Sequence, residues 1–340
     1  MAEFAIGHRM VGDGHPPLVI AEIGVNHNGS LPVALQMIAA AASAGAECVK
    51  LQTHIVEAEM VAESMPAHVA ETIRRCALSE AQERQLQAFA HELGLLYIST
   101  PFSIEAADRL QSMDVPAFKI GSGELTNLPL LEHVASFGKP VILSTGMGSL
   151  DEVWDAVGVF EERCPFVIMH CTSMYPTPPE CMRLGRMLDM RLHGLVGISD
   201  HSVGIACSLA AATLGACIIE KHFTLGGPCP DAEVSLYPTA LRALVLGAPH
   251  AWLAGRGVQF SPGPETHHEP LPDELRVARW ARHSVTLRVS VRADQVLTRW
   301  HLTTKRPARG IPASRLHECI GRTVTRDLPP DHQLQEGDLA

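Results

Sequence analysis

The chain has 340 residues, of which 46% are hydrophobic and 19% are charged. This composition is typical of a globular protein with a large core, and the length predicts two domains. The net charge of −10 excludes the basic surface that nucleic acid requires, and no apolar run is long enough to span a membrane. We therefore expect neither nucleic acid nor a membrane as a partner.

The cysteines and the N-terminus predict a cytoplasmic location. The nine cysteines are scattered, without a C-x-x-C pair, and no signal peptide begins the chain. Both features are typical of a protein whose thiols stay reduced.

Short apolar runs alternate with helical patterns along most of the chain. Residues 1–16 predict a hairpin that closes one end of the domain after it, and residues 53–77 form an insertion with mixed signals. The predicted strands are 17–24, 47–52, 95–99, 117–121, 140–144, 166–171, 195–198 and 216–219. The predicted helices are 31–44, 79–93, 104–112, 128–136, 150–161, 180–191, 203–215 and 239–253.

This alternation predicts an α/β fold, a (β/α)₈ TIM barrel over residues 1–254. An open, doubly wound sheet is the alternative, but it does not explain why polar motifs follow every strand. The proline-rich stretch 255–282 is expected to be a linker. Residues 283–340 lack helical repeats and predict a small β-rich domain.

Two histidines are candidate metal ligands. His201 and His222 end consecutive predicted strands that one helix joins. Adjacent parallel strands lie about 5 Å apart, so both imidazoles can bind one ion. A hydrogen-bonded core histidine is the alternative for either residue alone, but the nearby carboxylates of Asp200 and Glu220 favour a metal site.

Two lysines predict a site for phosphate. Lys50 and Lys119 follow apolar strand residues and are expected to point into the barrel mouth, where a lysine without an anion is costly. The hydroxyls of Thr100, Ser122 and Ser144 complete a cradle for phosphate. A Schiff-base lysine at position 50 and simple loop capping by the hydroxyls are the alternatives. A phosphorylated substrate is therefore expected to meet an electrophile that a cation polarises.

Several segments resemble the sialic acid synthase family, in order and over nearly the whole chain. They are AEIGVNHNG (21–29), KLQTH (50–54), STPF (99–102), FKIGSGE (118–124), STGM (144–147), HCTSMYP (170–176), SDH (199–201) and EKHFT (220–224). The tail, with Lys305-Arg306-Pro307 and Ile320-Gly321-Arg322, resembles the antifreeze-like (SAF) domain, a β-clip fold, that ends these synthases.

The resemblance implies an N-acetylneuraminate synthase-like transferase. Phosphoenolpyruvate would condense with an open-chain N-acyl hexosamine, N-acetylmannosamine or a diacetamido hexose, to give a nine-carbon 3-deoxy-2-keto acid and phosphate. Another phosphoenolpyruvate-dependent synthase of 3-deoxy-2-keto sugar acids, or a metal-dependent aldolase, is the alternative on the same fold.

The resemblance also implies roles for individual residues. His201 and His222 would hold Mn²⁺ or Mg²⁺, and Glu22 would transfer a proton or stabilise developing positive charge. The expected catalytic residues are Glu22, Lys50, Lys119, Tyr175, His201 and His222. The expected substrate-binding residues are Gln52, Thr100, Ser122, Glu124, Ser144, Ser173, Ser199, Asp231 and Arg306.

The tail has implications for the partner subunit, and three departures from the family's motifs have implications for the identity of the sugar and for the arginine of the tail. Arg306 matches an arginine that the SAF domain of one subunit inserts into its partner's site, which implies a domain-swapped homodimer. Arg309 competes with Arg306 for this role. Ser173 stands where some N-acetylneuraminate synthases have asparagine, and residues 226–230 (GGPCP) depart from the usual Pro-Gly-Pro.

Overall fold

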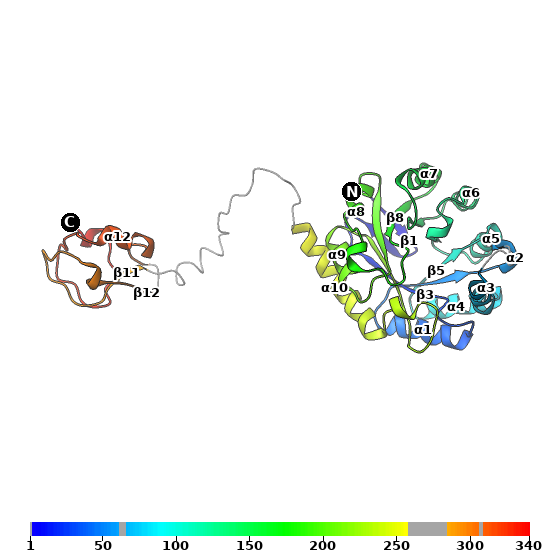
Figure 1. Ribbon diagram of the computed structural model, residues 1–340, viewed down its shortest axis with the longest axis horizontal. Coiled ribbons are helices and arrows are strands. Elements are labelled where there is room, and N and C mark those ends of the chain that lie inside the picture. Colours follow the sequence, from blue (N-terminus) through cyan, green and yellow to red (C-terminus); the bar gives the residue numbers. More distant parts are fainter. Residues whose placement is uncertain (1, 61–65, 258–283, 306–308) are drawn as a thin grey trace. The chain divides into compact units, whose positions relative to one another are not determined.

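The computed structural model describes residues 2–60, 66–257, 284–305 and 309–340 (Figure 1). The chain divides into two compact units, Met1–Phe260 and Ser261–Ala340. The predicted linker over 255–282 falls mostly on residues 258–283, which lie outside the described residues. The predicted domain boundaries therefore stay predictions.

The first unit is a closed barrel of parallel strands in the order β10-β3-β4-β5-β6-β7-β8-β9. The TIM barrel is thus confirmed, and the open sheet is excluded. The strands are β3 (Leu18–Gly24), β4 (Cys48–Thr53), β5 (Leu96–Pro101), β6 (Phe118–Ile120), β7 (Val141–Ser144), β8 (Phe166–Cys171), β9 (Leu195–Asp200) and β10 (Ile218–His222).

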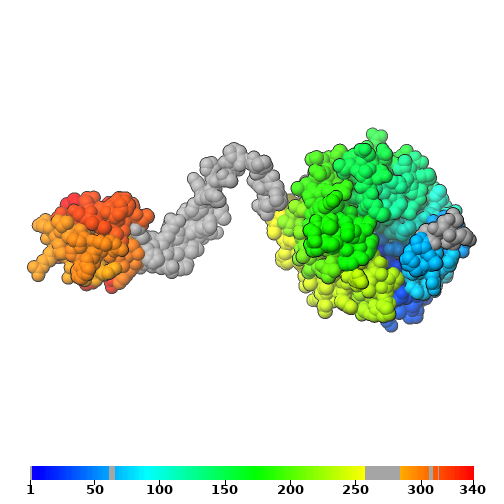
Figure 2. Space-filling view, in the orientation of Figure 1, coloured from blue at the N-terminus to red at the C-terminus, as the bar shows by residue number. Residues whose placement is uncertain are grey.

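Helices cover the outside of this barrel (Figure 1). They are α1 (Leu31–Ser43), α4 (Glu80–Glu92), α5 (Ile104–Ser112), α6 (Leu128–Ala135), α7 (Leu150–Phe160), α8 (Arg186–Met190), α9 (Ala206–Thr213) and α10 (Pro238–Gly257). Helices α9 and α10 pack side by side at the surface, green and yellow in Figure 2. Among the described residues, no helix is both long and apolar enough to cross a membrane.

Two stretches differ from the predicted pattern. The helix predicted over 180–191 is reduced to a 3₁₀ turn at Pro179–Cys181 and the short α8, because Arg183 adopts a positive φ of 47° that interrupts a helix. The insertion after β4 contains two short helices, α2 (Val56–Glu59) and α3 (Ala67–Cys76).

The predicted N-terminal hairpin is confirmed. Strands β1 (Glu3–Ile6) and β2 (Arg9–Gly12) pair in antiparallel orientation. Ile6 and Val11 belong to the same buried cluster as Leu18, Leu96 and Ile218, which begin barrel strands. The hairpin therefore closes the N-terminal end of the barrel.

The second unit has its own small core. Strands β11 (Ser284–Leu287) and β12 (Leu302–Lys305) are antiparallel, and the short helix α12 (Leu316–Cys319) follows. Val285, Leu287, Leu302 and Val324 are buried in one apolar cluster. The β-rich character agrees with the prediction, while the SAF assignment stays a prediction.

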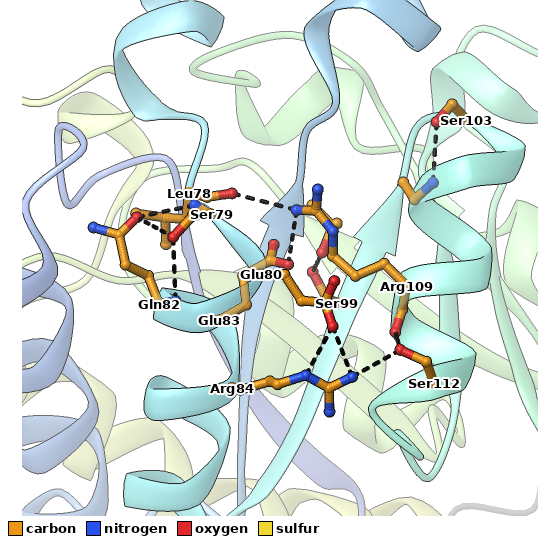
Figure 3. Close-up of polar contacts among 12 residues, drawn as sticks. Leu78, Ser79, Glu80, Gln82, Glu83, Arg84, Ser99, Ser103, Arg109 and Ser112 are labelled. Atoms are coloured by element: carbon orange, nitrogen blue, oxygen red, sulfur yellow. Dashed lines mark hydrogen bonds and ion pairs between the residues drawn. The ribbon is translucent and has the colours of Figure 1, made fainter.

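Polar contacts fix α4 and α5 to each other behind β5 (Figure 3). Arg109 Nη1 of α5 lies 3.2 Å from Glu83 Oε2 of α4, whose side chain is only 1% exposed. The same Nη1 donates to the Leu78 carbonyl oxygen at 3.3 Å. Arg84 instead reaches Glu80 and Ser112 at the surface, where both charged side chains are exposed.

We expect the two ion pairs to differ in their contribution to stability. Arg109→Met leaves the Glu83 carboxylate buried and unpaired, which should lower the free energy of unfolding by about 3 kcal/mol. The matched control Arg84→Ala should cost less than about 1 kcal/mol, because that pair is solvated. Urea denaturation of both variants measures the difference, and equal effects would contradict it.

Candidate active site

A cavity of about 450 Å³ opens at the carboxyl ends of the barrel strands. It brings together most of the predicted site residues: Glu22, Lys50, Gln52, Thr100, Lys119, Ser122, Ser144, Ser173, Tyr175, Ser199, His201, His222 and Asp231. Active sites of TIM barrels lie at this end.

The pleat of the strands explains why these side chains converge. In a strand, alternate residues face the same side. In β3, Leu18 and Ile20 belong to the apolar cluster inside the barrel, so Glu22 faces inward above them. In β10, Ile218 occupies the inner cluster, and Glu220 and His222 follow on the same face. The inner core therefore becomes polar toward the mouth.

Lys50 and Glu22 form one buried ion pair. Lys50 Nζ lies 2.8 Å from Glu22 Oε2 and donates to Thr100 Oγ1 at 2.9 Å. Burial lowers the pKa of Lys50, but the adjacent Glu22 carboxylate raises it above its ordinary value. Burial raises the pKa of Glu22 above its ordinary value, and Lys50 opposes that effect. Lys50 is thus held as a cation by the Glu22 carboxylate.

Lys119 is paired less closely. Its Nζ donates to Ser144 Oγ at 2.6 Å, whereas Glu220 Oε1 is 3.7 Å away. Burial consequently dominates and lowers the pKa of Lys119 below its ordinary value, although Glu220 opposes this. An anionic ligand would supply the close negative charge that Lys119 lacks.

Glu220 is the carboxylate that sequence reasoning noted beside His222 but did not assign to the site. Burial raises its pKa, yet Lys119 and Lys50 outweigh burial and hold the pKa at about 2. Its Oε1 accepts from Ser199 Oγ at 2.9 Å, and within the described part of the chain its Oε2 is buried without a hydrogen-bond partner. The available signal was the alternation of side chains along β10, which puts Glu220 on the same face of the strand as His222.

The two histidines lie together as predicted. The ring centres of His201 and His222 are 5.3 Å apart. His201 Nδ1 donates to the Thr172 carbonyl oxygen at 3.0 Å, which leaves the Nε2 lone pair free to bind a cation. His222 Nδ1 lies 3.2 Å from Asp231 Oδ2, an ion-pair contact rather than a hydrogen bond of regular geometry.

This geometry fits a metal ion held by two protein ligands. Imidazoles that bind one ion at about 2.1 Å place their ring centres roughly 5 Å apart. Across the described residues, no group of three or more His, Cys, Asp or Glu side chains is arranged to hold a metal ion. Further ligands would therefore come from substrate or water, which leaves positions open for chemistry.

Tyr175 and Asp231 complete one wall of the cavity beside the histidines. The Tyr175 ring lies against His201 with a centroid distance of 4.0 Å and the ring planes inclined by 31°. The side chain is half exposed, and the partial desolvation of its phenol raises the pKa, so the hydroxyl remains a hydrogen-bond donor. The backbone N–H of Asp231 donates to Asn26 Oδ1 at 2.9 Å, which fixes the loop that carries the carboxylate.

Among the described residues, one predicted site residue is not part of the cavity lining. Glu124 is half-buried, and its Oε2 accepts from Asn127 Nδ2 at 2.7 Å. Arg306 lies outside the described residues. The lining also includes Val25, Phe102, Met147 and Cys171, to which sequence reasoning assigned no role. Phe102 and Met147 end motifs that carried the family resemblance, which was the available signal.

Gly146 provides a test of this packing. A Cβ there would lie 2.2 Å from Ser173 Oγ and 2.7 Å from Ser122 Oγ, both in the cavity lining. We expect Gly146→Ala to displace these hydroxyls and to lower kcat/KM at least tenfold, while the melting temperature changes little. Gly158→Ala in α7 is the control, since its Cβ meets nothing within 4 Å. Full activity of Gly146→Ala would contradict the geometry.

The fold and the site together define a TIM-barrel enzyme whose mouth gathers lysines, carboxylates and imidazoles. Comparison with known proteins identifies its family. Residues 37–258 match the model of the NeuB family.

Two relatives match along almost their whole length. An uncharacterized protein of Methanocaldococcus jannaschii is 36% identical over 100% of this chain and 99% of its own. The N,N'-diacetyllegionaminic acid synthase of Campylobacter jejuni is 34% identical over 94% of this chain and 99% of its own.

A solved structure agrees with this relationship. The N-acetylneuraminic acid synthetase of Leptospira borgpetersenii superposes with a TM-score of 0.72 at 31% identity, covering 81% of this chain and 95% of that one. The chain therefore belongs to the NeuB family. It is a transferase of the sialic acid synthase type, a class that forms carbon–carbon bonds.

Proposed function

We propose that the enzyme condenses phosphoenolpyruvate with the open-chain form of an N-acyl hexosamine, either N-acetylmannosamine or a diacetamido hexose. The product is a nine-carbon 3-deoxy-2-keto acid. The observation that carries this proposal is the cavity that places Lys50 and Lys119 beside the imidazoles of His201 and His222. The names of the relatives, which are synthases of a diacetylated and of a monoacetylated nine-carbon sugar acid, support both candidate sugars.

Phosphoenolpyruvate binds at the lysines in this proposal. Lys50 and Lys119 supply positive charge, and hydroxyls beside them supply hydrogen-bond donors. These hydroxyls belong to Thr100, Ser122, Ser144 and Ser199, all of which line the cavity. The close negative charge that Lys119 lacks would come from the phosphate or the carboxylate of the substrate.

The sugar binds with its aldehyde toward His201 and His222, which would hold Mn²⁺ or Mg²⁺. When bound, the cation supplies a Lewis acid that polarises the aldehyde oxygen. Tyr175, Gln52, Ser173 and Asp231 line the same cavity as hydrogen-bonding partners for the hydroxyls and the acylamino group. Glu124 remains a proposed sugar contact, which requires the 3₁₀ turn Ser122–Glu124 to move.

The reaction balances as phosphoenolpyruvate plus hexosamine plus water, giving the nine-carbon acid plus phosphate. The enol carbon forms a bond to the aldehyde carbon, water adds to the pyruvyl carbon, and phosphate leaves by cleavage of its C–O bond. Glu22 would transfer a proton or stabilise positive charge, a role that its buried position beside Lys50 and its raised pKa support.

A homodimer with exchanged SAF domains also belongs to the proposal. Arg306, or Arg309 in its place, would enter the partner's cavity near the sugar. Sedimentation of the intact chain and of a chain that ends at residue 257 would show whether the second unit mediates association.

Product analysis tests the central proposal. Phosphate release is measured with phosphoenolpyruvate and a panel of N-acetylmannosamine, a 2,4-diacetamido hexose, arabinose 5-phosphate and erythrose 4-phosphate. We expect release with an N-acyl hexosamine and a nine-carbon acid by mass spectrometry. Release with only the sugar phosphates, or cleavage without phosphate release, would instead identify the synthase of shorter acids or the aldolase.

Metal removal tests the ligand assignment. We expect chelation followed by desalting to abolish phosphate release and Mn²⁺ or Mg²⁺ to restore it. His222→Gln should reduce Mn²⁺ affinity at least tenfold in calorimetry, because one of two protein ligands is weakened. Turnover that survives complete chelation would contradict the assignment.

A further inference from the structure

His54 lies immediately after β4, behind the cavity rather than in its lining. It is 5% exposed, and its position follows Gln52, which does line the cavity. A buried imidazole two residues from a side chain that lines the cavity can hold that side chain in place.

Polar partners face both nitrogens of the His54 ring. Nδ1 lies 2.9 Å and 3.1 Å from the two carboxylate oxygens of Glu59, at the end of α2. Nε2 lies 3.1 Å from Gln52 Oε1. The ring also stacks on Phe102, with centroids 4.5 Å apart and planes inclined by 9°. Two polar contacts and a stack leave the imidazole one orientation.

Gln52 continues this chain of contacts into the cavity. Its Nε2 donates to Glu22 Oε1 at 3.2 Å, and Glu22 is paired with Lys50. The contacts therefore run from Glu59 through His54 and Gln52 to Glu22. The first two residues lie outside the cavity lining, and the last two lie in it.

The surroundings select one of two carboxamide orientations for Gln52. In the orientation described, Oε1 accepts from His54 and the amino group donates to Glu22, and its second N–H remains for a ligand. In the reversed orientation, the carbonyl oxygen would face the Glu22 carboxylate, oxygen against oxygen. The Glu59 carboxylate only accepts, so Nδ1 carries a proton, and the ring has an Nε2–H as well only in its doubly protonated form. In that form the Nε2–H requires the Gln52 carbonyl oxygen as its acceptor and opposes the reversal.

We propose that His54 is a positioning residue that fixes the carboxamide of Gln52 so that its N–H groups point to Glu22 and to the sugar. The inference rests on the proposed function, because the contact between Gln52 and the sugar belongs to it. His54 acts through Gln52 and touches no substrate. Phe102, which lines the cavity, holds the imidazole from the side.

A double-mutant cycle separates this role from a general structural one. We compare His54→Leu, Gln52→Ala and the combined variant, using the aldose that the wild-type enzyme turns over. We expect His54→Leu to raise the KM for the aldose at least tenfold and the KM for phosphoenolpyruvate less than threefold. In the Gln52→Ala background, the same His54→Leu substitution should change the KM for the aldose less than twofold.

The opposite outcomes overturn the proposal. An equal effect of His54→Leu with and without Gln52 would show that it acts by another route. An equal rise in both KM values would show a general disturbance of the cavity. His133→Leu is the matched control, since it removes a histidine–carboxylate contact of 2.7 Å to Asp108 outside the cavity lining, and it should leave both constants unchanged.

Two further measurements keep the test decisive. If His54→Leu fails to fold, Glu59→Leu removes the anchor of the imidazole and enters the same cycle. A crystal structure of the folded variant, which needs no turnover, should show the Gln52 carboxamide rotated away from Glu22. A carboxamide that still presents its nitrogen to Glu22, at a resolution that distinguishes nitrogen from oxygen, would overturn the proposal. A wild-type enzyme that rejects N-acyl hexosamines would defeat the proposed function but would leave this structural test intact.

Discussion

The mouth of the barrel holds two lysines and two glutamates away from water, and their pairing constrains the rest of the site. Lys50 has a carboxylate at 2.8 Å, while the nearest carboxylate to Lys119 is 3.7 Å away. Buried charges cost several kcal/mol each unless they are paired, and apolar side chains of similar volume would often be at least as stable. The buried charges are therefore better explained by the binding of an anionic ligand than by a contribution to the stability of the fold.

The barrel supports these charges from below and from behind. Beneath the mouth, the inward residues are apolar, and the N-terminal hairpin closes the far end. Behind the histidines, Lys221 Nζ lies 3.2 Å from Asp200 Oδ1, and both side chains are fully buried. These two residues are register partners in β9 and β10. Their ion pair thus joins the two strands one residue before each imidazole, which fixes the separation of the rings.

Strand alternation accounts for how much of the fold and of the site the sequence could predict. Alternate residues of a strand face the same side, so the position of a lysine or histidine after an apolar run decides whether its side chain points into the barrel. As expected, Lys50, Lys119, His201 and His222 all line the cavity. Glu220 could have been added by the same rule, since it shares a face with His222. Loops have no such period. The contact of Asp231 with His222 and the pairing of Glu124 with Asn127 therefore could not be derived from spacing.

The sequence by itself determined the number of strands, their parallel order and the side chains that face the barrel axis, because each follows from local periodicity and connection length. Only the tertiary structure decided which charged groups approach one another, how burial shifts their pKa values, and that His54 lies against Gln52 with Glu59 behind it. These outcomes depend on how far apart neighbouring strands and loops place their side chains once the barrel closes, and no local pattern encodes that distance.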